Sequence, residues 1–438
     1  MVVELVINRI VAGGNGLATL DGLKVFVPFS APQEKVRARL VNRKHDYAVA
    51  EIEEVLEPSP IRVKPHCPWF GRCGGCQLQH ISYEGQLVVK KLIVNDALQH
   101  LGHIFVPVSN ITVEPEQWHY RNKTQYPVRF NNGLKLGFFR QGSHDLLDIP
   151  VCFLHPESFD RLRKAALNAI TATREKPYDE NRHKGNIRHL VLRKSESNDQ
   201  TLVIVVTRTG SLNPTLVKRL AEQPGVVGVI QTTNPDRTNR ILGKRKKTLT
   251  GLDYIFYHVL GKSFRVSMQS FFQVNTYQAA KLCRKVLKQV APNGDETVLD
   301  LFSGVGMISL ILADFVKSVT GIEIEPAAVA DAVFNAEQNG ADNLRFITGD
   351  VAAVIDSIEK ADIVVLDPPR KGCQARILKS ITELKPKKIV YVSCNPATLA
   401  RDLKLLDAMG YQTSAVEPVD MFPQTSHVEA ITLIVPQK

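Results

Sequence analysis

The sequence predicts an α/β protein with three regions: a small OB-like β-barrel over residues 1–58, a mixed α+β region over 59–265, and a doubly wound parallel sheet over 266–438. Two observations carry this prediction. Short strands with alternating apolar and polar residues fill the N-terminal region, a pattern typical of small antiparallel barrels. In the C-terminal region, strand-like apolar runs alternate with stretches of helical periodicity, which indicates a parallel sheet covered by helices.

The C-terminal elements follow one another without long gaps. The strands are expected over 296–302, 318–324, 344–350, 362–369 and 388–394, and the helices over 276–291, 307–315, 326–340, 375–384 and 398–410. A closing strand over 430–435 suits the antiparallel edge that such sheets often carry. In the middle region, Pro58 and Pro60 break the barrel pattern. The spacing of Leu87, Val94 and Leu98 then predicts a helix near 83–102, which would pack on the C-terminal domain.

The composition is that of an ordinary globular chain. The 438 residues, of which 44% are hydrophobic and 23% charged, suffice for two or three domains. The sequence has no apolar run long enough to cross a membrane, and its first residues lack a basic stretch before an apolar block. We therefore expect a cytoplasmic monomer with no membrane association and no secretory signal.

Positive charge is in excess and is concentrated in two places. The chain has 55 Lys and Arg against 44 Asp and Glu, a net charge of +11, which favours a nucleic-acid partner, although a solvated basic surface gives the same count. The first cluster lies in the predicted barrel and comprises Lys35, Arg37, Arg39, Arg43 and Lys44; the second comprises Lys244, Arg245, Lys246 and Lys247. Because small barrels commonly bind single strands through a basic face, we expect the barrel to bind RNA.

Polar side chains stand at the ends of four successive predicted strands, where parallel sheets bind ligands. The turn over 300–306 contains two glycines, which let the backbone approach a ligand. Glu323 follows at the distance at which an acidic residue binds both hydroxyls of an adenosine ribose, and Asp350 can meet an adenine amino group. Each carboxylate could instead cap a helix, and nicotinamide enzymes share the first two features. The Asp-Pro-Pro segment that begins at Asp367 favours a methyl donor.

Cys394 ends the predicted strand over 388–394, directly before a helix. Cysteine is usually a small core residue, but the N-terminus of a helix favours the reactive thiolate. Beside a methyl donor, a thiolate can add to C6 of a uracil and so make C5 nucleophilic. A base must then remove the C5 proton. Glu429 is the candidate for this base and His427 is its rival; a structural role stays open for both.

The blocks VSCNPATLARDL, DLFSGVGMISL, LDPPRKG, FPQTSHVE and QSFFQVN resemble the signatures of the bacterial uracil-5 RNA methyltransferases, and the resemblance covers essentially the whole chain. It implies a TRAM-type barrel and a Rossmann-like methyltransferase domain that uses S-adenosylmethionine. Cys394 would be the nucleophile and Glu429 the base. The implied cofactor contacts are Gln273, Phe302, Glu323, Asp350 and Asp367. Ser303 and Met307 depart from the usual pattern of the family.

Three cysteines are bunched, as Cys67-x5-Cys73-x2-Cys76, and Cys152 lies further along the chain. Four thiolates suit a structural zinc or an iron–sulfur cluster, and the five-residue gap is wide for zinc. Unliganded core thiols would leave the glycines among them without a purpose. The resemblance implies a [4Fe–4S] cluster on these four cysteines.

The sequence therefore predicts S-adenosylmethionine-dependent methylation of C5 of a uridine, with 23S ribosomal RNA as substrate because the chain resembles the ribosomal branch more than the transfer RNA branch. The target base should be flipped out of its helix, and Phe271 and Phe272 are expected to stack near it. Three alternatives stay open: 5-methyluridine formation in transfer RNA, methylation of another base or of protein, and an RNA-binding protein with a cluster and an inactive methyltransferase domain.

Overall fold

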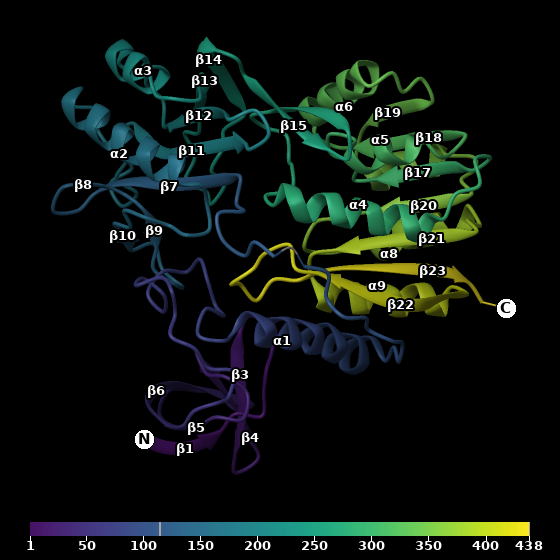
Figure 1. Ribbon diagram of the computed structural model, residues 1–438, viewed down its shortest axis with the longest axis horizontal. Coiled ribbons are helices and arrows are strands. Elements are labelled where there is room, and N and C mark those ends of the chain that lie inside the picture. The colour runs from purple at the N-terminus through teal and green to yellow at the C-terminus, as the bar shows by residue number, and fades with distance from the viewer. Residues whose placement is uncertain (114, 438) are drawn as a thin grey trace. The chain divides into compact units, whose positions relative to one another are not determined.

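The computed structural model describes residues 1–113 and 115–437 (Figure 1). These residues form two compact units. The first unit contains residues 1–113, 368–375 and 392–437, and the second contains 115–367 and 376–391. The α/β class expected from the sequence is confirmed, with a sheet-rich N-terminal region and a Rossmann-like parallel sheet. No helix within the described residues is both long and apolar enough to cross a bilayer.

The first unit begins with a six-stranded sheet in the order β1-β5-β6-β4-β3-β2. Its strands are β1 Val2–Val6, β2 Arg9–Ile10, β3 Asn15–Leu20, β4 Leu23–Pro28, β5 Lys35–Arg43 and β6 Tyr47–Glu57. All neighbouring pairs are antiparallel except β4 and β6. The alternation read from the sequence places small and β-branched residues inside, among them Val25, Val36 and Ala50, each fully buried.

The positive charge of β5 is largely offset by glutamates on its neighbouring strands. The ion pairs are Lys35–Glu4 at 2.9 Å, Arg37–Glu54 at 2.5 Å and Arg39–Glu51 at 3.3 Å. Cross-strand pairs of this kind stabilise a sheet. Of the five cations in the first basic cluster, three are therefore committed to contacts within the sheet.

The predicted helix near 83–102 is confirmed, with a change of winding along its length. Helix α1 (Tyr83–Asp96) begins after Ser82, whose hydroxyl accepts from the Gly85 N–H, and it continues as a π-helix over Ala97–Gly102. The π-helix packs on α9 (Pro396–Ala408), where a Cβ on Gly102 would lie 2.9 Å from the Ala400 carbonyl oxygen. The last strand, β23 (Glu429–Pro436), pairs antiparallel with β22 (Tyr411–Val419).

The second unit contains a six-stranded sheet in the order β14-β13-β12-β11-β7-β8, and Figure 1 shows α2 and α3 on one side of it. The strands are β7 Lys123–Phe130, β8 Leu134–Leu136, β11 Ile187–Ser195, β12 Gln200–Thr207, β13 Val226–Thr233 and β14 Arg245–Gly251, and the helices are α2 Glu157–Ala172 and α3 Pro214–Ala221. Phe159 and Leu216 from the helices pack on Leu192 and other strand residues in a common core. Two short hairpins accompany this sheet, β9 (Phe138–Phe139) with β10 (Leu146–Leu147), and β15 (Tyr254–Val259) with β16 (Lys262–Ser267).

The parallel strands run in the order β19-β18-β17-β20-β21. They are β17 Thr297–Leu301, β18 Ser318–Glu323, β19 Leu344–Thr348, β20 Ile363–Leu366 and β21 Lys388–Ser393. The helices are α4 Thr276–Val290, α5 Met307–Ala313, α6 Pro326–Gln338, α7 Val351–Val354 and α8 Ala375–Glu383. The first strand, β17, pairs with β18 on one side and β20 on the other. The strand order reverses there, which is where such sheets bind ligands.

Candidate active site

The turn between β17 and α5 contains two left-handed glycines with different environments. Gly304 has φ +57°, and a Cβ there would meet no atom within 4 Å. Gly306 has φ +77°, but a Cβ there would lie 2.8 Å from the Phe346 ring. Gly306 is therefore needed for packing, whereas Gly304 leaves open space that a ligand can fill.

Glu323 ends β18 with its carboxylate held in place by backbone groups. One oxygen accepts from the Gly304 N–H at 3.0 Å and the other from the Glu325 N–H at 2.8 Å. The side chain is only partly buried, so lone pairs stay available for the hydroxyls of a ribose. Beside it, the Ser303 hydroxyl is buried and has no hydrogen-bond partner among the described residues.

Asp300 on β17 is buried, and Asp367, directly after the neighbouring strand β20, is partly buried. Burial raises the pKa of Asp300 to about 7, although the Ser309 hydroxyl donates to it and partly opposes the rise. Burial likewise raises the pKa of Asp367 to about 7, and the charge of Asp300 adds to the effect. Two carboxyl groups whose charges influence each other favour a shared proton or a nearby cation.

Of the other predicted cofactor residues, Asp350 and Phe302 follow the parallel strands β19 and β17, and Gln273 lies between β16 and α4. Asp350 is exposed, and its side chain accepts from the Ala352 N–H at 2.9 Å and so caps α7. Phe302 follows β17 in a left-handed conformation with φ +64°. Gln273 is buried, and its side-chain amide makes no hydrogen bond with the described residues, while its carbonyl accepts from Asn122. The unused Gln273 amide and the unpartnered Ser303 hydroxyl both suit a polar ligand.

The expected stacking residues separate in the structure. Phe272 is buried and stacks on Tyr257 with ring centroids 4.3 Å apart, so it belongs to the core. Phe271 is 64% exposed and can meet a base. The expectation for Phe272 was wrong because adjacent residues of an extended segment face opposite sides.

Cys394 follows β21 directly and precedes α9, as the sequence predicts. Asn395 caps α9 by accepting from the Ala397 N–H at 3.1 Å, and its amide donates to the Arg370 carbonyl at 3.0 Å. The Cys394 side chain is partly exposed. It therefore stands near the positive end of a helix and within reach of solvent, two conditions that favour a nucleophilic thiolate.

Glu429 lies in the same unit as Cys394, at the first position of β23, where its side chain is 3% exposed. Arg370 donates to the His427 ring nitrogen at 3.2 Å. The rings of Phe422 and His427 lie edge to face, with centroids 5.9 Å apart. The two candidate bases, Glu429 and His427, therefore lie two positions apart at the start of β23.

The segment 420–428, which precedes Glu429, is bound to α1 and to the cysteine-rich segment. Gln424 donates its backbone N–H to the Gln86 amide oxygen at 3.0 Å and accepts from the Gln86 amide nitrogen at 3.0 Å. Lys90 donates to Asp420 at 2.5 Å and to the Phe422 carbonyl at 2.9 Å. The side chains of Lys90 and Asp420 are fully buried. These contacts fix the path of the chain into Glu429, and no sequence pattern indicated them.

The bunched cysteines lie in the first unit. Burial raises the pKa of both Cys67 and Cys73, and each accepts from nearby backbone N–H groups. Gly71 adopts a left-handed conformation with φ +80° between them. Within residues 1–113 and 115–437, no three His, Cys, Asp or Glu side chains are grouped as metal ligands.

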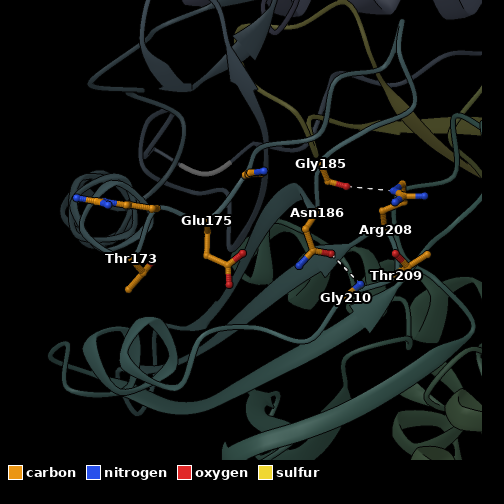
Figure 2. Close-up of a pocket in the computed structure, with 9 residues that line it drawn as sticks. Thr173, Glu175, Gly185, Asn186, Arg208, Thr209 and Gly210 are labelled. Carbon is orange, nitrogen blue, oxygen red and sulfur yellow. Dashed lines mark hydrogen bonds between the residues drawn. The ribbon is translucent and has the colours of Figure 1, made fainter.

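A cavity of about 410 Å³ in the central sheet region contains none of the predicted site residues. Figure 2 shows it between the end of α2 and the strands, with the Glu175 carboxylate near its middle. Arg208 lines it and donates to the Gly185 carbonyl at 3.1 Å. This cavity is separate from the strand-end residues described above.

Comparison with known proteins agrees with this geometry. Residues 292–418 match the family described as a methyltransferase domain. An uncharacterised RNA methyltransferase of Listeria innocua is 40% identical and covers 99% of this chain and 97% of its own length. An uncharacterised RNA methyltransferase of Halalkalibacterium halodurans is also 40% identical, with 99% and 96% covered.

A solved structure covers the whole fold. The Pyrococcus abyssi tRNA (uracil-54, C5)-methyltransferase, in complex with S-adenosyl-L-homocysteine, superposes with a TM-score of 0.80 at 29% identity and covers 99% of both chains. Because relatives named RNA methyltransferases are 40% identical over nearly the full length of both chains, the chain belongs to the family of S-adenosylmethionine-dependent RNA methyltransferases.

Proposed function

We propose that this RNA methyltransferase places its methyl group on C5 of a uridine, with Cys394 as nucleophile and Glu429 as base. The observation that carries the proposal is the arrangement of the first unit. The partly exposed Cys394 thiol lies at the N-terminus of α9. The buried Glu429 carboxylate lies in the same unit, after the segment 420–428, which hydrogen bonds hold to α1.

The reaction balances with these two residues. The Cys394 thiolate forms a bond to C6 and the 5,6 double bond becomes an enolate, whose C5 is the nucleophile for methyl transfer. S-adenosylmethionine supplies the methyl group as an electrophile. Glu429 then takes the C5 proton, the double bond re-forms, and the Cys394 sulfur leaves as thiolate. Because a stacked base hides C6, the uridine must be flipped out, and the exposed Phe271 ring can support it.

Gln273, Phe302, Glu323, Asp350 and Asp367 are proposed to bind the cofactor. S-adenosylmethionine has a ribose and an amino-acid group that need hydrogen-bonding partners. These partners are the Glu323 carboxylate, held by two backbone N–H groups, and the Gln273 amide, and the space beside Gly304 leaves room for the ligand. The Asp300–Asp367 pair fits the positive sulfonium, because a nearby cation favours the ionised carboxylates.

This assignment predicts that cofactor affinity depends on pH. With pKa values raised to about 7 in the free protein, the pair holds protons below that pH. A bound sulfonium lowers these pKa values, so binding releases protons and the association constant rises with pH until it levels off above about pH 7. S-adenosylhomocysteine lacks the charge and should show a smaller rise. Calorimetric titrations of both ligands in buffers of different ionisation enthalpy measure the difference; identical pH profiles would contradict the assignment.

The substrate is proposed to be 23S ribosomal RNA, because the sequence resembles that branch of the family. Transfer RNA is the second candidate, and the similarity to the Pyrococcus abyssi tRNA enzyme over 99% of both chains favours it. The test is to map 5-methyluridine in both RNAs from a strain that lacks this chain, and to methylate unmodified transcripts of each with the purified protein. We expect the ribosomal transcript to be methylated. If only transfer RNA accepts the methyl group, the second candidate replaces the first.

Cys67, Cys73, Cys76 and Cys152 are proposed to hold a [4Fe–4S] cluster, on the strength of their spacing and of the family resemblance. The left-handed Gly71 supports a loop that wraps a bound group. Iron and acid-labile sulfide in protein purified without oxygen would support the cluster, and zinc in their place would reject it. The N-terminal sheet is proposed as a TRAM-type RNA-binding domain over 1–58, followed by a central domain over 59–265 and the methyltransferase domain over 266–438.

A further inference from the structure

The second basic cluster belongs to a longer exposed stretch, the basic segment 237–247. It contains six cations, Arg237, Arg240, Lys244, Arg245, Lys246 and Lys247, all of them exposed. Lys246 pairs with Asp253 at 2.8 Å. The other five make no ion pair and no side-chain hydrogen bond with the described part of the chain.

This sets the basic segment apart from the first cluster. On β5, Lys35, Arg37 and Arg39 are each matched by a glutamate on a neighbouring strand. An exposed cation beside a glutamate attracts a phosphate less strongly, because the negative charge of the glutamate offsets its own. Among the described residues, five cations of the basic segment make no ion pair, against two in the first cluster, Arg43 and Lys44, so more of the uncompensated charge lies on the basic segment.

The loop that carries much of the basic segment is held by buried side chains. Arg188 donates to the carbonyls of Asn234 and Asp236, both at 2.6 Å. Asn234 in turn donates to the carbonyls of Arg240 at 2.5 Å and Ile241 at 3.2 Å. A loop fixed in this way presents its exposed side chains at little further cost in conformational entropy.

A cavity of about 380 Å³ lies beside this loop, at the low end of the range for ligand pockets. Three amide side chains line it, Gln125 from β7, Asn239 from the loop and Gln269 from the segment after β16. Gln125 and Asn239 make no side-chain hydrogen bond with the described residues, and Gln269 makes only a long one, 3.4 Å, to the Lys244 carbonyl. Glu325, two residues beyond the strand-end Glu323, also lines it.

We infer that the basic segment and this cavity bind the substrate RNA strand, with Lys244, Arg245 and Lys247 on its phosphates and one nucleobase of the strand in the cavity. The inference rests on the proposed function. Amide groups read the hydrogen-bonding edges of bases, and RNA is recognised through bases that are splayed out of a strand. Ile241 and Leu242 supply the apolar contact that a base also needs.

The cavity in Figure 2 suits this role less well. Glu175 lies within it, and it adjoins the C-terminal end of α2, where the helix dipole is negative. A different function for the basic segment is to protect β14, an edge strand, from pairing with other chains. Removing its charges would then cause aggregation without a loss of RNA affinity, which the first experiment separates.

The first experiment compares two triple variants that each remove three positive charges, K244Q/R245Q/K247Q and K35Q/R37Q/R39Q. A labelled 20-nucleotide oligouridylate is the probe, and Kd is measured at several salt concentrations. We expect the first variant to bind tenfold to about a hundredfold more weakly at 0.1 M salt, with a log–log salt slope shallower by roughly 2. The matched variant should stay within about threefold of the wild type. Equal weakening of both, or aggregation with unchanged affinity, would overturn the inference. The assay involves no methyl transfer, so its outcome is independent of the reaction proposed above.

The second experiment addresses the cavity. Transcripts of the RNA that proves to be the substrate carry single abasic sites at positions flanking the uridine. At one position, the loss of the base should lower kcat/KM of the wild-type protein by about tenfold. In Gln125→Ala and Asn239→Ala, kcat/KM should be the same with and without the base at that position, because the contact is already lost. Cofactor Kd should be unchanged in both variants. If the cofactor Kd changes, or if every abasic site lowers kcat/KM of the variants as much as that of the wild type, the cavity does not bind a base of the substrate.

Discussion

Replacing Cys394 by alanine should abolish methyl transfer while RNA and cofactor still bind. The nucleophile makes C5 reactive, and without it the rate should fall on the order of 10⁴-fold or more, as in other enzymes that lose a covalent nucleophile. The measurement is transfer of labelled methyl groups to the RNA, with calorimetric cofactor titration as the test of folding. Cys373→Ala is the matched control, because Cys373 is a buried thiol of the same unit outside the proposed chemistry. Near-wild-type turnover by Cys394→Ala would reject the nucleophile.

The companion variant separates the two candidate bases. Glu429→Gln keeps the nucleophile but cannot take the C5 proton, so the enzyme should remain bonded to the methylated RNA and migrate as a retarded band on a denaturing gel. The band should be absent when Cys394→Ala is added. His427→Gln should release product. If His427→Gln accumulates the adduct and Glu429→Gln does not, the roles are exchanged.

Much of the fold followed from residue patterns, and the exceptions have physical reasons. The β-strands and helices of the parallel sheet were predictable because buried strands are continuous apolar runs and each helix has one apolar side. The sequence did not indicate that Arg265 of β16 pairs with Asp331 of α6 at 2.8 Å. A polar contact between two elements leaves no periodic trace in a sequence. The π-helix over Ala97–Gly102 was missed for a similar reason, since its register depends on close packing against α9.

The sequence predicted those residues of the candidate site that stand at the ends of the predicted strands. Cys394, Glu323 and Asp367 each stand directly after, or near the end of, a predicted strand, so topology alone places each of them at the carboxyl end of a strand. The sequence did not indicate which of the Lys and Arg side chains are neutralised by an ion pair within the protein. Arg39 pairs with Glu51 twelve positions away, whereas Lys247 has no such partner in the described chain. Composition counts both cations equally, and only the pairing of strands distinguishes them.

Replacing Lys90 by methionine should lower the free energy of unfolding by about 3–5 kcal/mol, the typical effect of leaving one member of a buried ion pair alone. Lys90 and Asp420 have no exposed side-chain surface, and burial lowers the Lys90 pKa while the charge of Asp420 opposes that shift. The lost ammonium also leaves the Phe422 carbonyl without its donor. Denaturant unfolding measures the change. Lys91→Met is the matched control on the same helix, because Lys91 makes only an exposed hydrogen bond to Asn110, and it should cost less than about 0.5 kcal/mol.

The same pair connects stability to catalysis, because 330 positions of sequence separate Lys90 from Asp420 while only eight residues separate Asp420 from Glu429. A loosened segment 420–428 should misplace the base more than the nucleophile. Lys90→Met should therefore lower kcat and accumulate part of the RNA adduct at temperatures where it is still folded, with cofactor affinity unchanged. Adding Asp420→Leu removes the stranded charge and should recover most of the lost stability, since apolar replacements of buried ion pairs are often neutral. If the double variant regains stability but still accumulates adduct, the ion pair positions Glu429; if activity returns in proportion to stability, the pair only holds the fold together.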